Sequence, residues 1–244
     1  MAKDIKNKGG SVKLDVNLIR KSLGLTGHTG SQKTLNESYV VATKNFALRT
    51  EMFSTKNKKA HQQLLEGYVK AANSVSAQLD SVDRLTANAN HSEFRSLKID
   101  ETYNLNAAFL HGMFFDNISD LQSEISMDSL SYMRLERDFG TFDEWQQDFI
   151  ACALSSRNGW ALTVYNGFLN RYMNVVVDLH STNVPINCYP VIVLDMWEHS
   201  YYRDYLNDKK TYIFAMMKEL NWEIIEGRIK KSERVGKALL GGKD

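Results

Sequence analysis

Cysteine and proline are scarce in this chain, since each occurs twice in 244 residues. The cysteines, Cys152 and Cys188, lie far apart among apolar residues. We therefore expect buried free thiols in a reducing compartment rather than a disulfide scaffold. The sequence also lacks a cysteine cluster, a GxGxxG motif and a P-loop, which argues against a zinc module or a nucleotide-dependent enzyme.

Long hydrophobic runs are missing as well. No apolar stretch approaches the length of a membrane span, so a membrane protein is not expected. Residues 1–25 contain Lys, Asp and Gly where a secretory signal would have an apolar core and a cleavage site. These features predict no signal peptide and a cytoplasmic or particle-associated protein.

Charge is distributed unevenly along the chain. Residues 1–60 contain 12 Lys/Arg and 4 Asp/Glu, a net charge of +8, whereas the remaining residues carry −7. We interpret residues 1–44 as a basic N-terminal extension. It is either a solvated tail or an arm that docks on an acidic partner or on neighbouring subunits. Nucleic-acid binding has only this charge in its favour and is not expected.

The first half beyond the extension has helical periodicity. Ser54 and Thr55 are candidate N-caps of a first helix, in which Leu65, Val69 and other apolar residues recur at helical spacing. A second helix is predicted from about Asp100 to Leu121, after a polar connection. Residues 45–125 are therefore predicted to form a helical hairpin domain.

The second half, residues 126–244, changes character. Three short runs rich in Val, Ile and Tyr are bounded by Gly, Asn and Pro, as strands are. The predicted strands are 161–165, 172–178 and 191–194, and the predicted helices are 142–156, 201–205 and 210–226. Strands interspersed with helices favour an α+β fold.

Asp195 and His199 are the first candidates for chemistry. They are four residues apart, so one helical turn brings both side chains to the same face. A carboxylate and an imidazole at this spacing can share a metal ion or form a hydrogen-bonded pair, and spacing alone does not decide between them.

Two further histidines lie on the predicted helical hairpin. His111 lies within the apolar pattern of the second helix, and His61 lies beside the apolar stripe of the first. Each taken alone reads as a core histidine. Together with Asp195 and His199 they would form a three-histidine, one-aspartate set, which suits Fe, Mn or Zn and leaves a position for solvent. The pattern does not select a reaction.

Several motifs in residues 44–231 resemble the iron/manganese superoxide dismutase family. The stretch LDMWEHSYYRDY, which contains Asp195 and His199, resembles the family signature. The pattern HxxLxxGYV, beginning at His61, resembles the first helix of a divergent branch. The other matching stretches are YNLNAAFLHGMFFDNI at 103–118, RDFGTF at 137–142, NGWALTVY at 158–165 and NWEIIEGR at 221–228.

The resemblance implies a helical hairpin followed by an α/β domain with a three-stranded antiparallel sheet. It implies one Fe or Mn ion per chain, held by His61, His111, Asp195 and His199, and an antioxidant activity that disproportionates superoxide to oxygen and hydrogen peroxide. It also implies a homodimer or higher homo-oligomer, in which Glu198 reaches His199 of the neighbouring chain. Around the metal the resemblance places Trp160, Trp197, Glu198 and Tyr202.

The sequence departs from the family pattern near the metal. Leu65 stands where many members have a second histidine, and Tyr68 follows His61 by seven residues instead of eight. Ala107 occupies one of the two positions of the glutamine that contacts solvent at the metal. His180 lies near the other position, so the resemblance implies that His180 and Tyr68 tune the site and relay the proton. Ala107 together with a loop-borne residue resembles the manganese arrangement of the family, but a histidine in that loop is found with iron as well. The sequence does not decide between the two metals, and we favour iron slightly.

The same departures, together with the basic extension, are consistent with an alternative. A structural or assembly protein, for example a subunit of a large particle, could retain this fold with weak or no dismutase activity.

Overall fold

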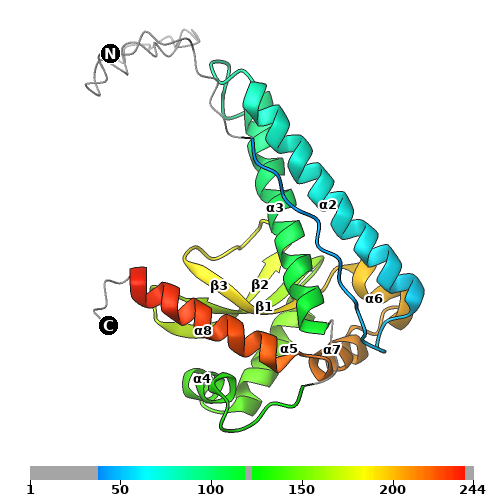
Figure 1. Cartoon of the computed structure of the whole chain (residues 1–244), viewed down its shortest axis with the longest axis vertical. Coiled ribbons are helices and arrows are strands. Elements are labelled where there is room, and N and C mark those ends of the chain that lie inside the picture. Colours follow the sequence, from blue (N-terminus) through cyan, green and yellow to red (C-terminus); the bar gives the residue numbers. More distant parts are fainter. Residues whose placement is uncertain (1–37, 119–122, 240–244) are drawn as a thin grey trace, which may run out of the picture.

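The computed structural model describes residues 38–118 and 123–239 (Figure 1). Within these ranges the chain forms seven α-helices and three β-strands, which confirms the α+β class. In chain order they are α2 (Thr55–Ser81), α3 (Glu93–Ile118), α4 (Leu130–Phe139), α5 (Phe142–Ser155), β1 (Gly159–Asn166), β2 (Arg171–Asp178), β3 (Cys188–Asp195), α6 (Glu198–Tyr205), α7 (Lys209–Lys218) and α8 (Trp222–Leu239).

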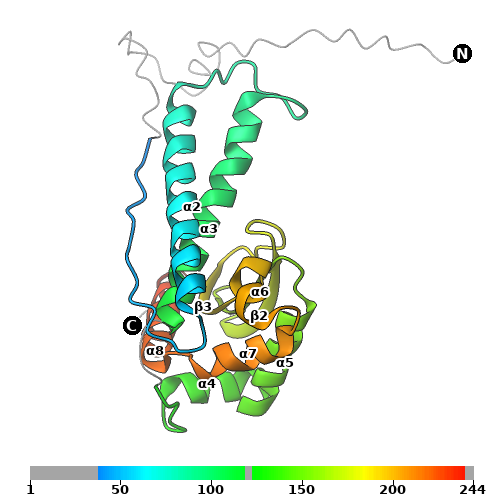
Figure 2. The same ribbon diagram turned by 90° about the vertical axis from the view of Figure 1, so that its right-hand side faces the viewer.

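Helices α2 and α3 form an antiparallel hairpin that projects from the rest of the molecule (Figures 1 and 2). Ser54 caps α2, since its hydroxyl accepts a hydrogen bond from the Asn57 backbone N–H at 3.1 Å. The outer end of the hairpin has a small hydrophobic cluster of its own, formed by Val75, Leu79, Val82 and Leu97. The inner end contributes to the main core.

An extended segment of residues 38–53, here called the strap, runs along the hairpin (Figure 1). The backbone N–H of Tyr39 donates to Ser76 Oγ at 2.7 Å, and that of Val41 donates to Asn73 Oδ1 at 2.7 Å. The boundary predicted at residue 44 therefore falls inside a segment that is bound to α2. Residues 1–37 of the predicted extension lie outside the described residues.

The three strands form an antiparallel sheet in the order β2-β1-β3, as expected. The register places Trp160 of β1 directly opposite Asp195 at the end of β3. Gly159 precedes Trp160, and a Cβ at this position would collide with the Val177 carbonyl oxygen of β2. Glycine at 159 thus permits the close strand approach that sets Trp160 beside Asp195.

Helices cover the sheet and share its core. Helix α5 packs on β1 and β2, whereas α3 and α8 both pack on β3. The main cluster runs without interruption from Phe46 of the strap, through Phe114 of α3 and Trp160 of β1, to Tyr212 of α7. The base of the hairpin and the α/β part are therefore held together by one hydrophobic core.

Two predicted helices differ from the observed ones. Helix α3 begins at Glu93 rather than near Asp100, because the Ser92 hydroxyl accepts the Arg95 N–H and caps an earlier turn. The helix predicted over 210–226 is two helices, α7 and α8. Asn221 starts the second, since its side-chain oxygen accepts the Ile224 N–H at 3.1 Å.

The cysteines and the apolar content of the helices were the subject of two further expectations. Both cysteines are free, as predicted, but each is only partly buried. In the described part of the chain, no helix combines the length and the apolar character that a membrane crossing needs.

Candidate metal centre

Four side chains converge where the hairpin meets the end of β3. His61 comes from α2, His111 from α3, Asp195 from the end of β3 and His199 from the first turn of α6. One donor atom from each lies within 4.8 Å of the other three, so a single ion could contact all four. These are the four residues that the sequence singled out.

The carboxylate of Asp195 is at the middle of this cluster. Its Oδ2 lies 3.0 Å from His61 Nε2, 3.3 Å from His199 Nε2 and 3.6 Å from His111 Nε2. Its Oδ1 accepts the Trp197 backbone N–H at 2.9 Å. That bond leaves Oδ2 directed at the three imidazoles and fixes the carboxylate plane.

The ring of His111 is oriented by its own helix. Its Nδ1 lies 2.7 Å from the Ala107 carbonyl oxygen one turn earlier, so Nδ1 carries the proton and donates it. The lone pair of Nε2 is then directed towards Asp195 and His199. This is the tautomer that a metal ligand needs, with the second nitrogen hydrogen-bonded to a carbonyl.

Burial determines the charge of the cluster. It lowers the pKa of His61, and it lowers the pKa of His111 to about 3, so both imidazoles are neutral at pH 7. Burial alone would raise the pKa of Asp195. Its interactions with His199, and the hydrogen bond with His61, nevertheless hold that pKa well below its ordinary value.

The donor set fits a transition-metal ion. Asp195 is fully buried and ionised, and among the described residues no Lys or Arg forms an ion pair with it. A buried carboxylate without a cation is costly. Three imidazoles and one carboxylate match the preference of divalent iron, manganese or zinc, and such an ion would neutralise the carboxylate.

His180 lies next to the four candidate ligands with both ring nitrogens engaged. The Trp160 indole N–H donates to His180 Nδ1 at 3.0 Å, and His180 Nε2 lies 3.0 Å from the Tyr68 hydroxyl. Because indole is only a donor, Nδ1 must be unprotonated and Nε2 carries the proton. Burial lowers the pKa of His180 to about 4, in agreement with a neutral ring.

The sequence predicted that His180 would act on solvent at the metal, and its Nε2–H is here shared with Tyr68. Tyr68 reaches this position although it follows His61 by seven residues. Seven residues are close to two full helical turns, so both side chains lie on the same face of α2. Burial raises the pKa of the Tyr68 hydroxyl well above its ordinary value.

Aromatic rings enclose the cluster. Trp160 meets His111 edge to face, with ring centroids 4.9 Å apart. Trp197 stacks on His180 at 4.8 Å and on His199 at 5.8 Å. Phe115 contacts His61 at 4.8 Å. The rings cover the imidazoles and restrict their rotation.

Sequence reasoning missed three residues that support the site. Tyr103 of α3 packs on His180 with centroids 4.6 Å apart, and Asn106 donates its amide to the His180 carbonyl at 2.8 Å. Tyr212 of α7 donates its hydroxyl to the Asp195 carbonyl at 2.6 Å. Asn106 and Tyr103 precede His111 by five and eight residues on its helix, which is the only signal in the sequence that could have indicated them.

One face of α6 is exposed beside the site. Glu198 is exposed, Tyr202 is 55% exposed and Leu206 is 62% exposed. Glu198 and Tyr202 are four residues apart and lie on one face of α6, and Leu206 follows directly after the end of the helix. Next to these residues, the His199 side chain is 28% exposed although its Nε2 faces the cluster.

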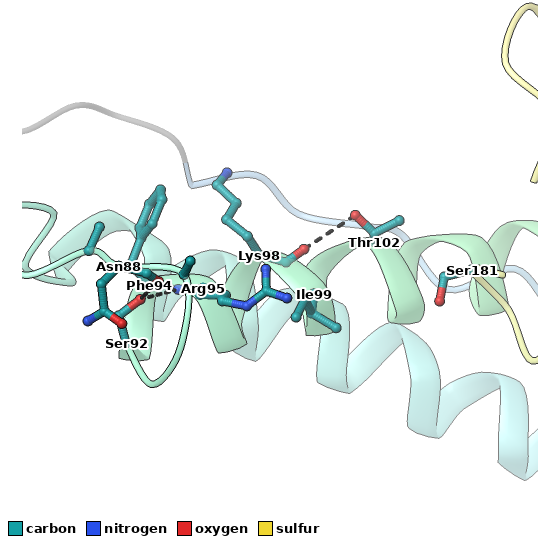
Figure 3. Close-up of a pocket in the computed structure, with 10 residues that line it drawn as sticks. Asn88, Ser92, Phe94, Arg95, Lys98, Ile99, Thr102 and Ser181 are labelled. Atoms are coloured by element: carbon teal, nitrogen blue, oxygen red, sulfur yellow. Dashed lines mark hydrogen bonds between the residues drawn. The ribbon is translucent and has the colours of Figure 1, made fainter. Parts of the chain in front are cut away.

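A groove of about 650 Å³ lies apart from the cluster, along the outer turns of α3 (Figure 3). Arg95, Lys98 and Ile99 line it, and it extends to Ser181. Ser181 follows His180 in sequence and Thr102, also in the lining, precedes Tyr103. One end of this groove therefore lies close to the residues that cover His180, while none of the four clustered residues lines it.

Comparison with known proteins identifies relatives that are named as metal-dependent enzymes. Residues 129–228 match the model of the iron/manganese superoxide dismutase C-terminal domain. The chain is 32% identical to a superoxide dismutase [Fe] of Aquifex aeolicus over 177 residues, covering 71% of this chain and 82% of that protein. It is 32% identical to superoxide dismutase [Mn] 1 of Halobacterium salinarum, covering 67% of this chain and 79% of that protein. It is 33% identical to a superoxide dismutase [Fe] of Cupriavidus metallidurans, covering 64% and 78%.

A largely buried cluster of three histidines and one aspartate between a helical hairpin and an antiparallel sheet is a site that could hold a single metal ion. Together with these matches, it shows that the chain belongs to the iron/manganese superoxide dismutase family. The resemblance inferred from the motifs is confirmed. The relatives bear the names of both metals, so they leave the choice between iron and manganese open.

Proposed function

We propose that this protein is an active superoxide dismutase that holds one iron ion per chain through His61, His111, Asp195 and His199. The observation that carries the proposal is the convergence of these four donors in a largely buried site. The bound metal would supply one-electron chemistry by alternating between its divalent and trivalent states. One superoxide is oxidised to oxygen, and a second is reduced to hydrogen peroxide with the uptake of two protons, as an antioxidant function requires.

The residues of the chain have to hold and deliver those protons. The Nε2–H of His180 and the hydroxyl of Tyr68 lie beside the cluster and are bonded to each other at 3.0 Å, and the Tyr68 ring is 5.2 Å from that of His111. The contact from Trp160 keeps the proton on Nε2, facing Tyr68. We therefore assign proton holding to this pair, with Tyr103 covering it from the outer side.

The exposed residues on and just after α6 support a homodimer. Glu198, Tyr202 and Leu206 would be covered by a second copy, and a two-fold arrangement would bring each Glu198 to the partner's exposed His199 edge. A carboxylate there would accept the Nδ1–H of His199 and fix its Nε2 lone pair towards the metal. The two metal sites would then depend on assembly.

Iron is favoured only slightly over manganese. Ala107 together with a loop residue beside the metal resembles the manganese arrangement, and the preference for iron rests on His180, since a histidine in that loop is found with iron as well. Localisation in the cytoplasm or within a particle remains a prediction, as does docking of residues 1–44 on an acidic partner or neighbouring subunits.

The test is elemental analysis of the full-length protein purified without added metal, followed by a superoxide-consumption assay scaled to metal content. About one iron per chain with rapid consumption is expected. Stoichiometric metal with negligible consumption would contradict the enzymatic proposal and favour the structural alternative. Zinc alone in the site would contradict the redox chemistry.

A further inference from the structure

Among the buried polar atoms that have no hydrogen-bond partner in the described residues, two belong to α2 next to the metal centre. One is Nδ1 of His61, and the other is Oδ1 of Asn57. Asn57 is fully buried and His61 is 2% exposed. Buried polar atoms in folded proteins are nearly always paired, so two unpaired atoms in one place require an explanation.

The two atoms lie one helical turn apart on α2. Residues four apart lie on the same face, and helical side chains lean towards the preceding turn. The imidazole of His61 therefore leans towards the turn that carries Asn57. The other neighbours of this ring are aromatic, since Phe114 and Phe115 have centroids 5.7 and 4.8 Å from it.

The amide orientation of Asn57 is fixed independently. Its Nδ2 donates to the Ser200 carbonyl at 2.8 Å and to Asp204 Oδ2 at 3.0 Å. Both partners are acceptors, so the nitrogen and not the oxygen must face them. Oδ1 is therefore an acceptor that points away from α6.

The protonation of His61 depends on metal. Without metal, its Nε2 can donate to Asp195 at 3.0 Å. A metal at Nε2 needs the lone pair there, so the proton must then reside on Nδ1, which becomes a buried donor that needs an acceptor. Asn57 Oδ1 is the unpaired acceptor one turn away.

We propose that Asn57 is a positioning residue for the metal centre, whose amide oxygen accepts the Nδ1–H of metal-bound His61 through one buried water molecule. The two atoms have no direct hydrogen bond in this structure, so a bridging water would give each of them a partner. The same amide holds Ser200, the neighbour of His199, so Asn57 joins the His61 ligand to the helix that carries His199. This inference rests on metal binding as proposed above, and not on catalysis.

The test measures Mn²⁺ binding and melting temperature for the full-length wild-type protein and three variants. Asn57→Leu removes the acceptor and the tie to α6. Asp204→Ala is the matched control, since it removes one acceptor of the Asn57 amide and leaves Oδ1 in place. The double variant Asn57→Asp with Asp204→Asn reverses the polarity of the contact with Asp204 and keeps an oxygen for His61. It gives up the bond to the Ser200 carbonyl, as Asn57→Leu also does, so the two differ in the acceptor oxygen.

Asn57→Leu should weaken Mn²⁺ binding by about 10–100-fold, which is typical for an outer partner of a ligand. Asp204→Ala and the double variant should bind nearly as the wild type does. The rise in melting temperature on adding Mn²⁺ should shrink only in Asn57→Leu, whereas a purely structural role would lower the metal-free and metal-loaded values equally.

The inference is overturned if Asn57→Leu binds Mn²⁺ as the wild type does, or if Asp204→Ala weakens binding equally. If Asn57→Leu does not fold, the double variant decides, because lost binding in a folded double variant contradicts the role of the acceptor oxygen. A wild-type protein that takes up neither Mn²⁺ nor iron would instead contradict the proposed function, and this inference with it.

Discussion

Replacing His180 tests the assigned proton path most directly. The ring is fully buried, and each nitrogen has one partner, Trp160 on Nδ1 and Tyr68 on Nε2. Two substitutions separate its effects. His180→Gln offers an oxygen to the Trp160 indole and an N–H to Tyr68, so it can reproduce both contacts. His180→Leu fills similar space and reproduces neither.

The magnitudes follow from the contacts. His180→Leu leaves the buried Trp160 indole N–H without its partner, which costs about 1–3 kcal/mol, and removes one partner of the half-buried Tyr68 hydroxyl. We expect the free energy of unfolding to fall by about 1–3 kcal/mol, with metal content nearly unchanged because His180 is not one of the four donors. The rate of superoxide disproportionation should fall by about 10²–10⁴-fold, as for loss of a positioned proton-transfer group.

The assay follows superoxide decay after rapid mixing, with rates scaled to bound metal, for wild type and both variants. His180→Gln should lie much closer to wild type than to His180→Leu. Full activity in His180→Leu would refute the proton role of His180. A metal-loaded His180→Gln as slow as His180→Leu would show that the two hydrogen bonds do not explain the role.

Three further predictions concern assembly and stability. Glu198→Ala should shift the protein towards monomers in sedimentation experiments and speed metal loss, whereas the exposed control Glu223→Ala should do neither. In the metal-free protein, the folded-state pKa of His111 is about 3, below the unfolded value, so the unfolded state binds more protons in acid. The free energy of unfolding should therefore fall as the pH drops below about 6.5, and His111 alone should contribute a loss of roughly 2 kcal/mol between pH 7 and pH 5. Denaturant unfolding that gives the same free energy at pH 7 and pH 5 would contradict this. Removal of residues 1–37 should reduce assembly size, with unchanged metal content, if this arm docks on other subunits, and an unchanged assembly size would contradict docking.

Residue patterns predicted the main architecture well. The apolar spacing around Leu65 and Val69 indicated α2, Ser54 indicated its start, and Val- and Ile-rich runs indicated all three strands. The four candidate ligands also came from the sequence. His61 and His111 were recognisable only through family motifs, because a histidine on an apolar helix face is equally compatible with an ordinary core position.

Features that depend on long-range contacts could not be predicted. The start of α3 was missed because its first turns, Glu93–Ile99, bury only Leu97 and show no clear stripe. Tyr212 supports Asp195 from 17 residues away, and Asn106 binds the His180 loop from 74 residues away. Residues this far apart in sequence are not related by helix or strand periodicity, so no local sequence pattern indicates that they are in contact. The pairing of Trp160 with Asp195 likewise depends on strand register.

The order of the four donors along the chain has a consequence for biosynthesis. His61 and Asp195 are separated by 134 residues, and His111 precedes His199 by 88. On the ribosome, both helical histidines emerge long before the carboxylate that completes the set. The nascent hairpin can offer an ion only two neutral imidazoles, and the strand and the helix that carry the other donors are translated near the end. Cotranslational capture of the ion is therefore disfavoured, and metallation is expected to follow release of the chain, when the composition of the surrounding metal pool decides which ion is taken up.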